Sequence, residues 1–138
     1  MDPARVREIA LRIASAAAGV EGVTSALVCS SEGAVLGAAR VADPAREAAL
    51  GSFIAARAEA LPVDGDLRGM GKQLAGSRFR HMAVAADGGD SMLFDLTNGA
   101  YLSVRIGPGR TPATSAPLAT LAQRATDLFE TSMRSPRP

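Results

Sequence analysis

The segment from Asp43 to Leu61 constrains the fold more than any other part of the chain, because it predicts a helix with two apolar sides. Asp43-Pro44 is typical of a helix start, and Pro62 ends the helix. With about 100° of rotation per residue, one stripe consists of Leu50, Ile54, Ala58 and Leu61. The nearly opposite side consists of Ala45, Ala49, Ser52, Phe53, Ala56 and Ala60. Such a helix is usually covered on both sides, so one side can pack on a sheet of the same chain and something else must cover the other.

Two further helices are expected, one near each end of the chain. Asp2-Pro3 predicts the start of the first, and Gly19 and Gly22 end it. Its apolar stripe consists of Val6, Ile9, Ala10, Ile13, Ala17 and Val20. The last helix is expected to begin near Ala116 or Pro117, and residues 133–138 are expected to form a flexible tail. The apolar stripe of this last helix consists of Leu118, Leu121, Ala122, Ala125, Leu128 and Phe129.

Five short strands are expected between these helices. Residues 23–30 and 34–39 predict a first hairpin, and Asn98-Gly99 is a strong turn signal between the last two strands. The five predicted strands cover residues 23–30, 34–39, 79–86, 91–96 and 100–106. In the last two, one face carries Met92, Phe94, Leu96, Leu102, Val104 and Ile106. The order α-β-β-α-β-β-β-α predicts an α/β (α+β) fold, a single five-stranded antiparallel sheet with helices on both faces. One domain is expected over residues 1–132, with a long glycine-rich connector at 62–78 that is functional or mobile.

The charge balance gives no support to a nucleic-acid or membrane partner. Fifteen Lys and Arg against fourteen Asp and Glu leave a net charge of +1, and no basic block follows that could track a phosphate backbone. No apolar run reaches the roughly 18 residues of a membrane span. The single cysteine, Cys29, cannot form an internal disulfide, so a reducing, cytoplasmic location is expected.

The sequence also lacks the residue sets that catalysis and cofactor binding need. Residues 65–73 are glycine-rich, but a phosphate loop requires glycine where Asp66 stands and Ser or Thr where Gln73 stands. His81 is the only histidine, which favours a structural or interface role, and Cys29 is expected to be a buried apolar residue. One His and one Cys fall short of the usual three or four zinc ligands. No catalytic, cofactor-binding or metal-ligating residue is therefore predicted, and the chain is not expected to be an enzyme acting alone.

Two stretches, residues 19–37 and 92–104, resemble the roadblock/dynein light chain family, whose bacterial members include regulators of Ras-like GTPases. The first looks like the end of the family's first helix and its first hairpin, and the second like its closing hairpin. The resemblance implies a homodimer with a shared sheet, formed through the predicted strand 79–86 and the helix 43–61. It also implies binding to a small Ras-like GTPase as a regulator or scaffold, or a role as an adaptor in a motor or signalling complex.

The expected dimer interface combines the alanine-rich side of the central helix with the third strand. It consists of Ala45, Ala49, Ser52, Phe53, Ala56, Ala60, Phe79, His81, Met82 and Ala83. Arg46 and Arg57 border the Leu50 stripe and are either contacts for a GTPase or a solvated helix edge. Neither is assigned as an arginine finger.

Three functions remain open from the sequence. The first is a homodimeric regulator or scaffold of a small GTPase, and the second is an adaptor that is indifferent to any GTPase. The third is a small-molecule sensor. Four Phe, one Tyr and mostly small apolar residues do not indicate a large ligand pocket, which disfavours the sensor.

Overall fold

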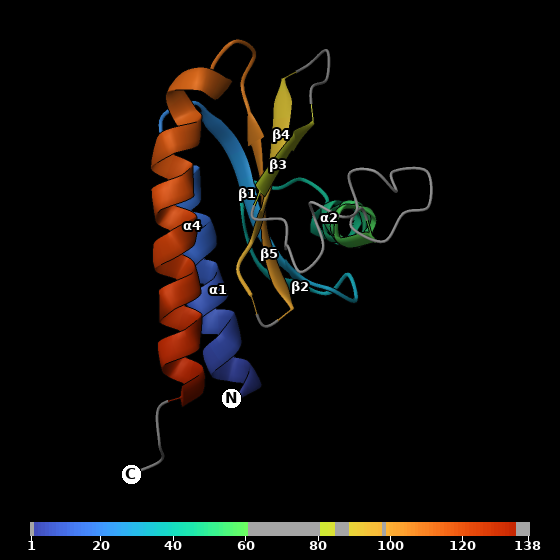
Figure 1. Ribbon diagram of the computed structural model, residues 1–138, viewed down its shortest axis with the longest axis vertical. Coiled ribbons are helices and arrows are strands. Elements are labelled where there is room, and N and C mark those ends of the chain that lie inside the picture. Colours follow the sequence, from blue (N-terminus) through green and yellow to red (C-terminus); the bar gives the residue numbers. More distant parts are fainter. Residues whose placement is uncertain (1, 61–80, 85–88, 98, 135–138) are drawn as a thin grey trace, which may run out of the picture.

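A five-stranded antiparallel sheet separates two helical layers in the computed structural model, which describes residues 2–60, 81–84, 89–97 and 99–134 (Figure 1). The strand order is β2-β1-β5-β4-β3, with antiparallel pairing between all neighbours. Helices α1 and α4 cover one face, and α2 covers the other. The predicted class, with one antiparallel sheet and helices on both faces, is confirmed.

The described elements follow the predicted order α-β-β-α-β-β-β-α. Their bounds are α1 Pro3–Ala18, β1 Val23–Ser30, β2 Val35–Ala39, α2 Pro44–Ala60, β3 His81–Val84, β4 Asp90–Asp95, β5 Ala100–Ile106 and α4 Thr111–Arg134. The connector predicted at 62–78, Phe79 and the outer parts of the predicted strand 79–86 lie outside the described residues.

The two Asp-Pro pairs start helices, as the sequence predicts. The Asp2 carboxylate accepts a hydrogen bond from the Ala4 amide at 3.3 Å, and Asp43 accepts one from the Arg46 amide at 3.3 Å. These side chains satisfy amides that have no partner inside the helix, while proline fills a position that needs no donor. Local sequence therefore determines where α1 and α2 begin.

The larger part of the core lies between the sheet and the α1/α4 layer. The predicted alternation is confirmed, because the apolar face of β4 and β5 is buried there. Its members are Met92, Phe94, Leu96, Leu102, Val104 and Ile106. A smaller cluster lies under α2 and consists of Leu27, Cys29, Ala48, Ala55, Leu93 and Tyr101.

Helix α4 begins earlier than predicted. It starts at Thr111 rather than near Ala116, and Pro117 lies inside it. The cause is a tertiary contact. Thr114 is buried, and its hydroxyl donates a hydrogen bond to the Glu21 carbonyl at 3.0 Å. This contact anchors the first turn to the loop after α1, and Pro117 removes only one helical donor. The helix continues to Arg134, so residues 133 and 134 are helical rather than part of the predicted tail, and 135–138 lie outside the description.

Within the described residues, no helix is both long enough and apolar enough to cross a bilayer.

Helix α1 crosses the edge strand β2 at Gly37. A Cβ atom added there would lie 2.6 Å from the Leu11 nitrogen and 2.7 Å from the Ala10 carbonyl carbon. Both are backbone atoms of α1, so no side-chain rotation can relieve the overlap. Glycine at this position sets how closely the helix approaches the sheet.

We predict that Gly37→Ala lowers the free energy of unfolding by about 1–3 kcal/mol, because α1 must shift away from β2. Gly19→Ala is the matched control. Gly19 has a helical φ of −81°, and an added Cβ there meets only ordinary contacts at 3.4 Å and beyond. Urea unfolding measures both variants. Equal midpoints for Gly37→Ala and the wild type would contradict the close approach.

Candidate protein-interaction surface

The side of α2 that packs on the sheet is made of small residues. Its buried members are Ala48, Gly51, Ala55 and Ala58. A Cβ added at Gly51 would lie 3.2 Å from the Cys29 sulfur and 3.8 Å from Leu93. The side chains of the sheet fill the space beneath the helix, so only small residues fit above them.

The sheet-facing side is thus rotated from the predicted stripe of Leu50, Ile54, Ala58 and Leu61. Only Ala58 of that stripe is buried; Ile54 is half-buried, Leu50 is 41% exposed, and Leu61 lies outside the described residues. Placing the alanine-rich side in the dimer interface left the Leu50 stripe to face the sheet. The close approach at Gly51 reverses this, because it leaves no room for Leu50 beneath the helix.

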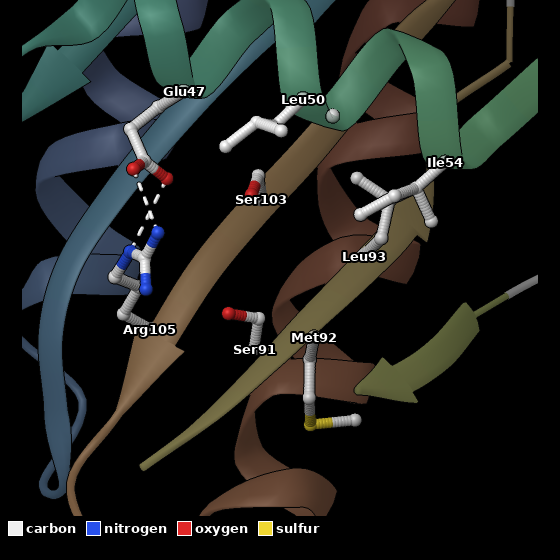
Figure 2. A pocket seen from close by; sticks show the side chains of 9 residues that line it. Glu47, Leu50, Ile54, Ser91, Met92, Leu93, Ser103 and Arg105 are labelled. Carbon is white, nitrogen blue, oxygen red and sulfur yellow. Dashed lines mark hydrogen bonds and ion pairs between the residues drawn. The ribbon is translucent and has the colours of Figure 1, made fainter. Parts of the chain in front are cut away.

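Two polar contacts fix the helix at its ends. Arg105 on β5 donates two hydrogen bonds to Glu47 in the first turn, at 2.7 Å and 3.2 Å (Figure 2). These bonds raise the pKa of the Arg105 guanidinium against the lowering effect of partial burial. At the other end, the hydroxyl of the buried Tyr101 donates to Glu59 at 2.9 Å. The carboxylates of α2 are therefore used for attachment to its own sheet.

A groove of about 80 Å³ lies between α2 and strands β4 and β5. Its lining residues are Glu47, Leu50, Gly51, Ile54, Ser91, Met92, Leu93, Ser103 and Arg105. Figure 2 shows Leu50 above Ser103, Ile54 beside Leu93, and the Glu47–Arg105 pair at one end. Pockets for small molecules usually measure about 300–1,000 Å³. This groove is the size of a side chain, which argues against its use as a sensor pocket.

Strand β3 forms the sheet edge beyond this groove. In the part of the chain that the structure describes, β3 pairs with β4 alone. His81 and Ala83 are exposed; Met82 is half-buried and packs on the cluster under α2. The His81 ring lies 5.7 Å from that of Phe94, its partner on β4, at an angle of 33°. Met82 and the groove therefore lie on one face of the sheet, and His81 lies on the other.

The solvent-facing side of α2 is apolar at its centre. Phe53 is 64% exposed, with Ala49, Ala56 and Ala60 four before, three after and seven after it, all exposed. Arg46 and Arg57 complete the same side, seven before and four after Phe53. We call these six residues the outer face.

The predicted interface combined the alanine-rich side of α2 with strand β3, but the side of α2 that faces the β3 edge carries Leu50 and Ile54. Ser52 and Ala49 face the turn between β1 and β2, since a Cβ added at Gly33 would lie 3.3 Å from the Ser52 hydroxyl and 3.8 Å from the Ala49 Cα. Leu50 and Ile54 face β4 and thus the β3 edge. The predicted helix residues Ala45, Ala49, Phe53, Ala56 and Ala60 are exposed, and Ser52 is half-buried. Their place in an interface stays a prediction.

Solved structures share this architecture. No protein-family model and no curated protein matches the sequence. A roadblock/LC7 domain from Streptomyces avermitilis matches with a TM-score of 0.72 at 19% identity, over 91% of this chain and 98% of that one. The gliding protein MglB of Thermus thermophilus matches at 0.63 and 17% identity, over 92% of this chain and 93% of that one. Myxococcus xanthus MglB matches at 0.62 and 14% identity, over 99% and 96%. The chain has the roadblock/LC7 fold.

Within this roadblock fold, sequence reasoning missed the groove side of α2. Leu50 was expected in the core. Glu47 and Arg105 were not identified as a pair, because 58 residues separate them in the chain. The available signal was Gly51, a glycine in the middle of a helix. A glycine there destabilises the helix relative to alanine and is explained by close packing.

Cys29 is buried under α2, as predicted. Burial raises the pKa of its thiol from 9.0 to about 11, because the thiolate would lose its hydration. Within the described residues, no three His, Cys, Asp or Glu side chains gather as a metal site would require.

We predict that the Cys29 thiol makes stability pH-dependent above pH 9. The folded state has the higher pKa, so the contribution is complete below about pH 9 and is lost as the pH rises to about 11. The free energy of unfolding should fall by about 1.4 kcal/mol per pH unit in that window from this group alone. Urea unfolding of the wild type and Cys29→Ala between pH 8 and pH 11 (roughly the titration window) isolates this slope. Parallel curves for the two proteins would refute the assignment.

Proposed function

We propose that this chain is a homodimeric, non-catalytic protein-binding module that regulates or scaffolds a small Ras-like GTPase. The observation that carries the proposal is the β3 edge, which among the described residues pairs with β4 alone and lies beside the exposed Leu50 side of α2 within a roadblock fold.

The β3 edge supports self-association. His81–Val84 contains no Lys, Pro or carboxylate, which are the residues that commonly protect an exposed strand edge. Pairing of two copies about a two-fold axis would join their sheets through β3 and satisfy the free backbone groups. This pairing through β3 also places the second chain next to Leu50, Ile54 and the groove, because these face the β3 edge. In this arrangement the groove side of α2, rather than its alanine-rich side, contacts the second copy.

The GTPase partner is supported by likeness rather than by a reactive site. Residues 19–37 and 92–104 resemble roadblock regulators of Ras-like GTPases, and two MglB structures share the fold. The exposed side chains of the outer face of α2 are apolar and basic, and they suit binding of a protein surface more than chemistry on a small substrate.

We predict that the wild-type protein has a solution mass near twice the 14.1 kDa of one chain. Leu50→Glu should shift it toward the monomer, because a charge placed in the groove side opposes burial against a second copy. Ala49→Glu is the matched control, with the same new charge one residue away on the outer face. Light scattering at micromolar concentration measures all three. A monomeric wild type would contradict the predicted dimer. A monomeric Ala49→Glu together with a dimeric Leu50→Glu would place the interface on the alanine-rich side.

We further predict that the purified protein binds a small Ras-like GTPase of its source organism with a preference for one nucleotide state. Each such GTPase is loaded with GDP or a non-hydrolysable GTP analogue and titrated by biolayer interferometry. Equal affinity for both states would favour the adaptor function. Failure of every GTPase to bind would overturn the proposed partner.

A further inference from the structure

We infer that the outer face of α2 (Arg46, Ala49, Phe53, Ala56, Arg57 and Ala60) docks an acidic protein surface, one with carboxylates on both sides of an apolar patch. The inference rests on the proposed function, because it gives the chemistry of the GTPase surface that the module would bind.

The centre of the outer face has the composition of a binding anchor. Phe53 is 64% exposed, the most exposed large apolar side chain of those that the structure describes. The alanine side chains around the ring are short, so the backbone of a partner can approach closely and cover the ring. Aromatic side chains in the middle of an interface, once desolvated, commonly supply much of the binding free energy.

Two exposed arginines flank this centre. Arg46 and Arg57 are separated by eleven residues, or about 16 Å along the helix axis. Both are exposed, and among the described residues no carboxylate lies within ion-pair distance of either guanidinium. The carboxylates of α2 are engaged elsewhere, Glu47 with Arg105 and Glu59 with Tyr101. The six residues of the outer face include two cations and no carboxylate, so the face complements negative charge.

Helix stability does not account for Arg46. A cation in the last turn, such as Arg57, interacts favourably with the helix dipole, but one in the first turn is opposed by it. Arg46 lies in that first turn, where its guanidinium has no carboxylate partner among the described residues. An anionic partner outside the chain would favour a cation at this position.

In the proposed dimer Phe53 and the alanines of the outer face lie away from the second copy, and Arg46 and Arg57 lie at the border with the Leu50 side. The second copy approaches the Leu50 and Ile54 side, which faces β4, while Phe53 points away from the sheet. Each dimer thus carries two outer faces. A protein partner fits better than a membrane or nucleic acid, because two arginines around one aromatic ring form a small patch on a chain whose net charge is only +1.

Charge reversal tests the inference. The variant Arg46→Glu/Arg57→Glu is compared with Arg12→Glu/Arg124→Glu, which makes the same charge change at exposed positions on α1 and α4. Each dimer is titrated with the purified GTPase, in the nucleotide state that the wild type prefers, at about 50 and about 300 mM salt. We expect the α2 variant to lose about tenfold or more in affinity at low salt and the control to change little. Phe53→Ala should weaken binding without altering the salt dependence.

The outcomes separate the two proposals. Wild-type binding with equal losses in both double variants would overturn the acidic-surface inference and leave the regulator intact. Absence of wild-type binding to every GTPase would overturn both. Restored binding of the α2 variant when a carboxylate of the partner is changed to lysine supports direct pairing. Binding of anionic phosphatidylglycerol vesicles with the same dependence on Arg46 and Arg57, but no GTPase binding, would assign the face to a membrane and refute the inference.

Discussion

The close approach of α2 to the sheet is the contact on which the rest of the surface depends. Gly51 leaves room for the Cys29 sulfur and Leu93 directly beneath the helix. Ala48, Ala55 and Ala58 continue the same thin layer. Because small residues contribute little buried apolar area, the helix also needs its polar attachments, Glu47 to Arg105 and Glu59 to Tyr101. Packing and these two contacts together hold α2 in one rotation about its axis.

That rotation decides which side chains are available to other molecules. With the small residues turned to the sheet, Leu50 and Ile54 face β4 and the β3 edge. Phe53, four residues from Ala49 and Arg57, points to solvent. A helix turned so that Leu50 was buried would offer neither the groove nor the same outer face. The two exposed surfaces are consequences of one packing choice beneath the helix.

Local and periodic signals predicted most of the fold. The Asp-Pro pairs marked two helix starts, and alternation in residues 91–106 identified the face that the core buries. Those signals act between near neighbours, so the sequence displays them. The start of α4 and the rotation of α2 depend on contacts across the fold, from Thr114 to Glu21 and from Gly51 to Cys29. The two-sided character of α2 was visible in the sequence, but which side meets the sheet was not.

The acidic and basic side chains of α2 point in different directions, so a chain that is nearly neutral overall has a locally basic surface. Glu47 and Glu59 turn toward β5 and are bonded there, while Arg46 and Arg57 stay in solvent. The net charge of +1 does not reveal this arrangement, because it sums charges over the whole chain. The Glu47 carboxylate is paired with Arg105, so its charge is offset within the domain. The ion pair that fixes the first turn of the helix therefore also leaves the two arginines as the charged groups of the outer face.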